Sequence, residues 1–84
     1  MIVIKIHDWH PERAYGSYGL HEIEVRLRMY TDLKHKREIE ALAKQIQERT
    51  CTQIPLAKAK DRYEAHSMRS LLDGLGAETT VEEI

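Results

Sequence analysis

The chain has 84 residues, with 13 basic and 14 acidic side chains and a formal net charge of -1. A chain this short supports one hydrophobic core, so we expect a single domain spanning residues 1–84. The charge balance excludes a global field that would draw the protein to nucleic acid or an anionic membrane. The single cysteine, Cys51, excludes an internal disulfide. Without a signal peptide or an apolar run of about 18 residues, the sequence predicts a cytoplasmic protein with no membrane partner.

Residues 2–7 carry isoleucine at every second position, which predicts a strand with one buried face. The segment "HEIEVRLRMY", residues 21–30, alternates in the same way, with apolar side chains at positions 23, 25, 27 and 29. Period two fits this segment better than 3.6, so it is predicted to be the longest strand, whose outward face carries two acids followed by two arginines. Residues 8–21 then form a long loop between two strands.

The period changes after residue 31. Residues 32–49 predict a helix with Thr31 or Asp32 as its N-cap. Residues 51–56 read as a short edge strand because Pro55 interrupts them. From Asp61, a capping box with Glu64 predicts a second helix, which Gly74 or Gly76 stops in the left-handed conformation. Residues 77–83 form the last predicted strand.

This order, ββαβαβ, predicts a two-layer α/β sandwich. About four strands form a mixed sheet, because a helix between two strands of one sheet normally makes a right-handed parallel crossover. Two amphipathic helices can cover one face of such a sheet only. The other sheet face is therefore predicted to be open.

The segment "DRYEAHSMRSLLDGLGAETTVEE", residues 61–83, resembles the final helix and strand of the C-terminal domain of the bacterial ribosomal stalk protein. That fold is shared with the adaptor of the Clp protease. The resemblance rests on the capped start at Asp61, on Ala65, Met68 and Leu72, on the turn at 76–78 and on Val81. It covers about a quarter of the chain and implies a small α/β binding module.

Histidines and an acid gather near the first strand, where His7, Asp8, His10 and His21 could serve as zinc ligands. Their spacing lacks the paired positions of a structural zinc site, so we expect hydrogen-bonding loop residues and no metal or other cofactor. Cys51 and the serines lack the local context of an activated nucleophile. The sequence therefore predicts that the protein is not an enzyme.

The loop segment "YGSYGL" combines glycines with large amphipathic side chains, a composition that binding loops use. Loops of this length are uncommon in compact domains unless they have a function. Trp9, Tyr15 and Tyr18 are therefore predicted to contact a partner. The favoured function is a small non-catalytic binding module for a protein partner, of the accessory, adaptor or inhibitor kind found in bacteria and phages.

Two alternatives stay open. A nucleic-acid-binding protein would use the basic patch of Arg26, Arg28, Lys34, Lys36 and Arg37 for phosphates. A metal-dependent enzyme would use the histidines around Trp9. The sequence identifies neither the partner nor the oligomeric state.

Overall fold

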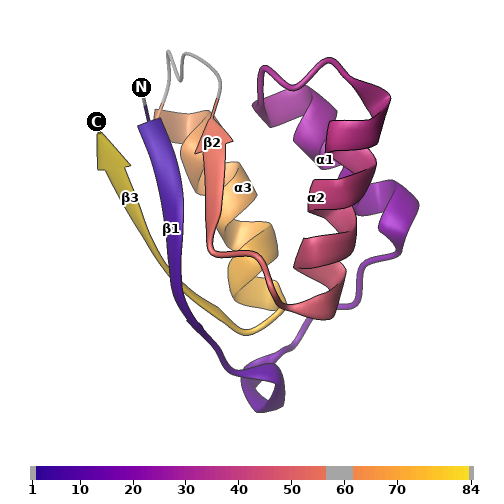
Figure 1. Cartoon of the computed structure of the whole chain (residues 1–84). Helices are drawn as coiled ribbons and strands as arrows, with labels where there is room; N and C mark the ends of the chain where they lie inside the picture. The colour runs from indigo at the N-terminus through magenta and orange to yellow at the C-terminus, as the bar shows by residue number, and fades with distance from the viewer. Residues whose placement is uncertain (1, 57–61, 84) are drawn as a thin grey trace.

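The computed structural model describes residues 2–56 and 62–83, and for residues 62–64 the backbone only. This part of the chain forms a small α+β domain with three strands and three α-helices (Figure 1). In chain order they are β1 (Ile2–Trp9), the 3-10 turn η1 (Pro11–Arg13), α1 (Leu20–Tyr30), α2 (Lys36–Glu48), β2 (Gln53–Leu56), α3 (Arg62–Gly74) and β3 (Ala77–Glu83). None of these helices has the length and apolar character needed to cross a bilayer.

The sheet has the order β2-β1-β3, and β1 pairs antiparallel with both neighbours. The predicted four-stranded mixed sheet is therefore wrong for the described residues, since every hydrogen-bonded pair of strands is antiparallel. The two strands that α3 connects, β2 and β3, run parallel to each other with β1 between them (Figure 1). The elements β2, α3 and β3 therefore form the predicted β–α–β crossover, which passes across the central strand β1.

One face of the sheet and all three helices share a single core. Ile4 and Ile6 of β1 join β2 side chains and helix residues in one buried cluster. On the opposite face Val3 is also fully buried, and its cross-strand partners are Pro55 and Glu82. The central position of β1 explains this burial, because strands on both sides shield its side chains.

The predicted strand over residues 22–30 is wrong, because this segment is helix α1. Ile23 and Leu27, four residues apart, are fully buried, whereas the alternate apolar residues Val25 and Met29 are 36% and 61% exposed. The polar residues also pair along the helix rather than across a sheet. The ion pairs Glu22–Arg26 (3.8 Å) and Glu24–Arg28 (4.0 Å) have the i,i+4 spacing that stabilises helices.

The helix predicted over residues 32–49 is confirmed as α2, but it begins four residues later. Thr31 ends α1 instead of capping α2, since its hydroxyl donates to the carbonyl of Leu27 at 2.6 Å. The residue preceding α2 is His35, which makes no side-chain capping bond.

The remaining elements follow the prediction. The strands at 2–7, 51–56 and 77–83 and the helix before Gly76 are present, and Gly76 has the expected positive φ of 90°. The capping box lies outside the described residues, because Asp61 and the Glu64 side chain are not described. The resemblance to the ribosomal stalk domain stays a prediction.

Candidate functional site

A β-bulge shapes the end of β1. Ile6 pairs with Thr79 and Asp8 with Glu78, so His7 is an extra residue between the two pairs. Bulges redirect side chains and are frequent beside functional sites. Here the bulge places the carboxylates of Asp8 and Glu78 opposite each other on adjacent strands, where like charges are unfavourable unless something neutralises them.

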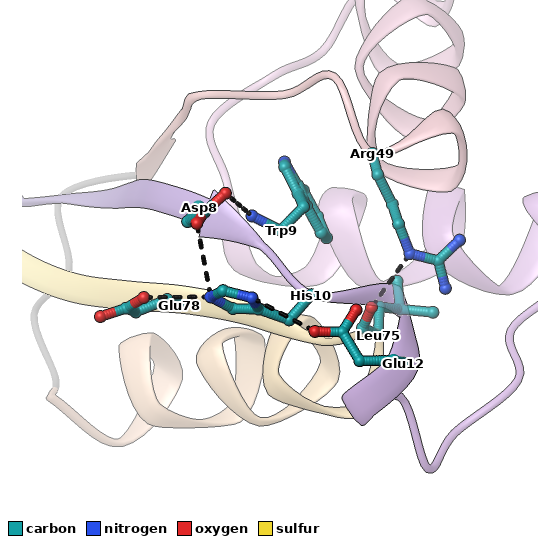
Figure 2. A network of polar contacts seen from close by, with 7 residues as sticks. All are labelled: Asp8, Trp9, His10, Glu12, Arg49, Leu75 and Glu78. Carbon is teal, nitrogen blue, oxygen red and sulfur yellow. Dashed lines mark hydrogen bonds and ion pairs between the residues drawn. The ribbon is translucent and has the colours of Figure 1, made fainter.

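The imidazole of His10 lies among three carboxylates (Figure 2). Its Nε2 is 3.3 Å from Oε2 of Glu78 and 3.5 Å from Oδ2 of Asp8, and its Nδ1 is 3.5 Å from Oε1 of Glu12. We call Asp8, His10, Glu12 and Glu78 the acid–histidine cluster. The three carboxylates are each more than 60% exposed, whereas the His10 side chain is 22% exposed. The ring is therefore held at the surface, with both nitrogens turned toward acids.

The backbone around His10 is fixed from several sides. Its N–H donates to the carbonyl of Gly76 at 2.6 Å, and a Cβ on Gly76 would lie 2.1 Å from the His10 carbonyl oxygen. The indole N–H of Trp9 donates to the Cys51 carbonyl at 2.9 Å. The Trp9 backbone N–H donates to Oδ1 of Asp8 at 2.8 Å, which leaves Oδ2 directed at the imidazole (Figure 2). These bonds position the cluster before any ligand arrives.

Sequence reasoning found half of this cluster. Of the predicted metal candidates, His10 and Asp8 come together, whereas His7 hydrogen bonds to Oγ1 of Thr80 at 2.7 Å and His21 lies exposed on α1. Glu12 and Glu78 were missed. Glu12 follows His10 by two positions in the same loop, but Glu78 is 68 residues away and only the strand register brings it near.

The predicted contact aromatics differ in their environments. Trp9 and Tyr18 are partly buried and pack against the core cluster, so their rings contribute to the core. Tyr15 is 77% exposed. Tyr15 is therefore the member of this trio whose ring is free to meet a partner.

The predicted nucleic-acid patch is largely neutralised within its own helices. Arg26, Arg28 and Lys36 each pair with a glutamate four residues away along the chain. Lys34 and Arg37 are exposed and make no ion pair with the described side chains. The nucleic-acid alternative stays a prediction that depends mainly on these two residues.

Cys51 lacks the features of an activated nucleophile. The residue is 2% exposed, and its thiol contacts the carbonyl of Gln53 at 3.4 Å. Burial raises the pKa of the Cys51 thiol, which disfavours the reactive thiolate. The expectation of a non-catalytic protein is compatible with this environment and stays a prediction.

A groove of about 460 Å³ lies between α3 and the strands β1 and β3. One lining residue, Arg69, is already hydrogen bonded: its guanidinium donates to the hydroxyl and the carbonyl of Thr79 at 3.0 and 3.1 Å. The lining residues are Ile2, Ala65, His66, Arg69, Val81 and Glu83. The Arg69 side chain is therefore held against β3 by the protein itself.

A further surface was missed because residues 22–30 were assigned to a strand. Val25 and Met29 lie one helical turn apart on the side of α1 that faces away from Ile23 and Leu27. The ion pairs Glu22–Arg26 and Glu24–Arg28 run along the two borders of this apolar pair. We call these six residues, Glu22, Glu24, Val25, Arg26, Arg28 and Met29, the outer face of α1.

No protein-family model, curated protein or solved structure matches this chain at a significant level. Function is therefore argued from two local arrangements. One is the outer face of α1, which can offer an apolar contact with a charged border. The other is the acid–histidine cluster, which can offer ligands for a cation.

Proposed function

We propose that this protein is a non-catalytic protein-binding module that docks a partner on the outer face of α1. The observation that carries this proposal is the exposed pair Val25 and Met29, bordered on both sides by ion pairs. Protein interfaces commonly have an apolar centre surrounded by a polar rim. Methionine suits such a centre, because its flexible, polarizable side chain adapts to the partner's shape.

The charge order of α1 defines the partner's chemistry. Glutamates occupy the N-terminal half of the outer face and arginines the C-terminal half. A partner helix that runs antiparallel to α1, with acids in its first half and bases in its second, places opposite charges together on both borders. Its apolar stripe then covers Val25 and Met29, which is the helix-packing mode of recognition.

Tyr15 provides a second contact in this proposal. It precedes α1 in the loop and is the most exposed of the large hydrophobic side chains described in 2–56 and 65–83. Tyrosine is enriched among the residues that dominate binding energy, because it buries a large area and retains a polar group. A partner bound along α1 and the preceding loop fits an accessory, adaptor or inhibitor protein.

Site-specific photo-crosslinking in the native host tests the proposal. A benzophenone amino acid replaces Met29 in one variant and Ala41, an exposed position on α2, in a matched control. We expect one discrete adduct with a second protein from position 29 and none from position 41. A further variant, Val25→Glu, should abolish the adduct, because it places an unpaired charge in the apolar centre.

Three results would contradict the proposal. These are adducts of equal yield from both positions, an adduct that survives Val25→Glu, and an adduct that contains only a second copy of this chain. Nucleic acid that co-purifies with the protein and is retained on a filter at about 50 mM salt would favour the alternative function instead.

A further inference from the structure

We propose that the acid–histidine cluster is a binding site for a divalent first-row transition metal ion such as Zn²⁺. The three ligands are Oδ2 of Asp8, Nε2 of His10 and Oε2 of Glu78, and the ligating groups of these residues lie within 4.8 Å of one another. Two ligands come from facing strand positions and the third from the residue that follows β1 (Figure 2).

Two of the three separations between the donor atoms match tetrahedral coordination, and the third lies within 4.8 Å. Metal–ligand bonds of about 2.0–2.1 Å place neighbouring donors of a tetrahedral zinc site about 3.3 Å apart. The observed separations from Nε2 are 3.3 Å to Glu78 and 3.5 Å to Asp8. An ion can therefore enter with small side-chain movements, and a water molecule or another ligand takes the fourth position.

Glu12 gives the imidazole the arrangement of a metal ligand. Nδ1 of His10 lies 3.5 Å from Oε1 of Glu12, whereas the hydrogen bond of the ring joins Nε2 to Oε2 of Glu78 at 3.3 Å. Metal-bound histidines usually donate their second ring N–H to a carboxylate or a carbonyl. If an ion occupied the position between Asp8 and Glu78, Nε2 of His10 would bind it and Nδ1 would be left to face Glu12.

That electrostatic arrangement calls for a cation. The carboxylates of Asp8 and Glu78 face each other on adjacent strands, and both lie within 3.5 Å of Nε2 of His10. No lysine or arginine whose side chain is described in 2–56 and 65–83 lies within 4.0 Å of the three carboxylates. A metal ion bound between Asp8 and Glu78 would offset the repulsion between these two carboxylates.

The ligand set selects the class of ion. Imidazole with carboxylates suits zinc and its neighbours, whereas magnesium and calcium prefer oxygen ligands alone. The imidazole thus separates this cluster from an ordinary exposed group of acids. Hydrogen bonds hold the backbone around Gly76 and Trp9, which reduces the loss of conformational entropy when an ion binds.

Isothermal titration calorimetry on the full chain, purified without an affinity tag, tests the site. We expect one equivalent of Zn²⁺ to bind, and Co²⁺ to give the visible absorption of a four-coordinate site, while Mg²⁺ at the same concentration does not compete. His10→Ala and Glu78→Gln should each weaken Zn²⁺ binding at least tenfold. Glu12→Gln, which removes the negative charge beside Nδ1, should weaken it about tenfold.

His21→Ala is the matched control, because His21 is exposed on α1 and no contact links it to the cluster. Its Zn²⁺ affinity should equal that of the unchanged protein. Circular dichroism checks that each variant is folded. If His10→Ala does not fold, the Zn²⁺ affinity of Glu78→Gln decides the outcome. The proposal is overturned if no saturable binding occurs below about 1 mM Zn²⁺, or if folded Glu78→Gln binds as tightly as the unchanged protein.

Discussion

The strand β1 and the helix α1 contribute to the same core in very different ways. β1 lies between two strands and buries side chains on both of its faces, among them Val3 and Ile4. α1 packs mainly against α2 and α3 and buries two residues, Ile23 and Leu27. The two segments nevertheless share an alternation of apolar and polar residues. Alternation alone therefore does not decide between a strand and a helix.

Their polar residues make the distinction. In β1, Lys5 pairs with Glu82 of β3 at 3.5 Å, and His7 hydrogen bonds to Thr80, which is also on β3. In α1, each glutamate pairs with the arginine four positions later. Partners four residues apart along the chain favour a helix, whereas polar residues without such a partner are free to pair across a sheet.

The test with the largest expected effect replaces two alternate apolar residues of α1 by alanine. Leu27→Ala should lower the free energy of unfolding by about 2–5 kcal/mol, because it leaves a cavity in the core. Met29→Ala should change it by no more than about 0.5 kcal/mol, since Met29 is exposed. Urea titration measures both values. Similar losses at the two positions would show that they share one buried face, as in a strand.

A second test compares Gly76, which lies against the residue that follows β1, with Gly19 at the start of α1. Gly76→Ala should cost about 2–3 kcal/mol, because its positive φ and the His10 carbonyl leave no room for a Cβ. Gly19, at the N-cap of α1, has no atom within 4 Å of an added Cβ. Gly19→Ala should therefore cost less than about 1 kcal/mol. Equal losses of stability for the two variants in thermal denaturation would contradict the view that Gly76 fixes the backbone at the end of β1.

Most of the fold could be predicted from the sequence, because β1, α2, α3 and β3 carry their own periodic signals. α1 could not be predicted from its apolar residues, since Val25 and Met29 serve no core and therefore obscure the helical period. The i,i+4 charge spacing was the available signal. In the acid–histidine cluster, Asp8 and His10 could be paired from sequence. Glu78 could not, because its position depends on a bulge that sequence patterns do not specify.

A third test concerns the loop that joins β1 to α1. Tyr18 packs on Gly16 and Gly74, where an added Cβ would lie 2.9 Å from a ring carbon and 3.3 Å from the hydroxyl oxygen, respectively. Tyr18→Ala should lower the free energy of unfolding by about 2 kcal/mol, less than a fully buried aromatic. Tyr15→Ala should leave stability unchanged within about 0.5 kcal/mol. A stability loss for Tyr15→Ala as large as that for Tyr18→Ala would show that Tyr15 is also part of the core and would weaken its proposed role in binding.

The smallest expected effect tests the charge argument itself. Glu24→Arg replaces the attraction to Arg28 by a repulsion, which should cost about 0.5–1 kcal/mol, since each i,i+4 pair contributes about 0.2–0.5 kcal/mol with either sign. The double variant Glu24→Arg/Arg28→Glu restores an ion pair in reversed order. It should recover part of the loss but remain less stable than the original, because acids belong near a helix N-terminus and bases near its C-terminus.

Salt provides the control for this last comparison. The difference between Glu24→Arg and the double variant should shrink as the salt concentration rises toward about 1 M, where charges are screened over about 3 Å. A difference that persists at high salt would mean that residue 24 acts through packing, which its partly buried side chain allows. The i,i+4 ion pairs would then stabilise α1 too little to explain why this segment is a helix. The packing of Ile23 and Leu27 against the core would have to account for the helix alone.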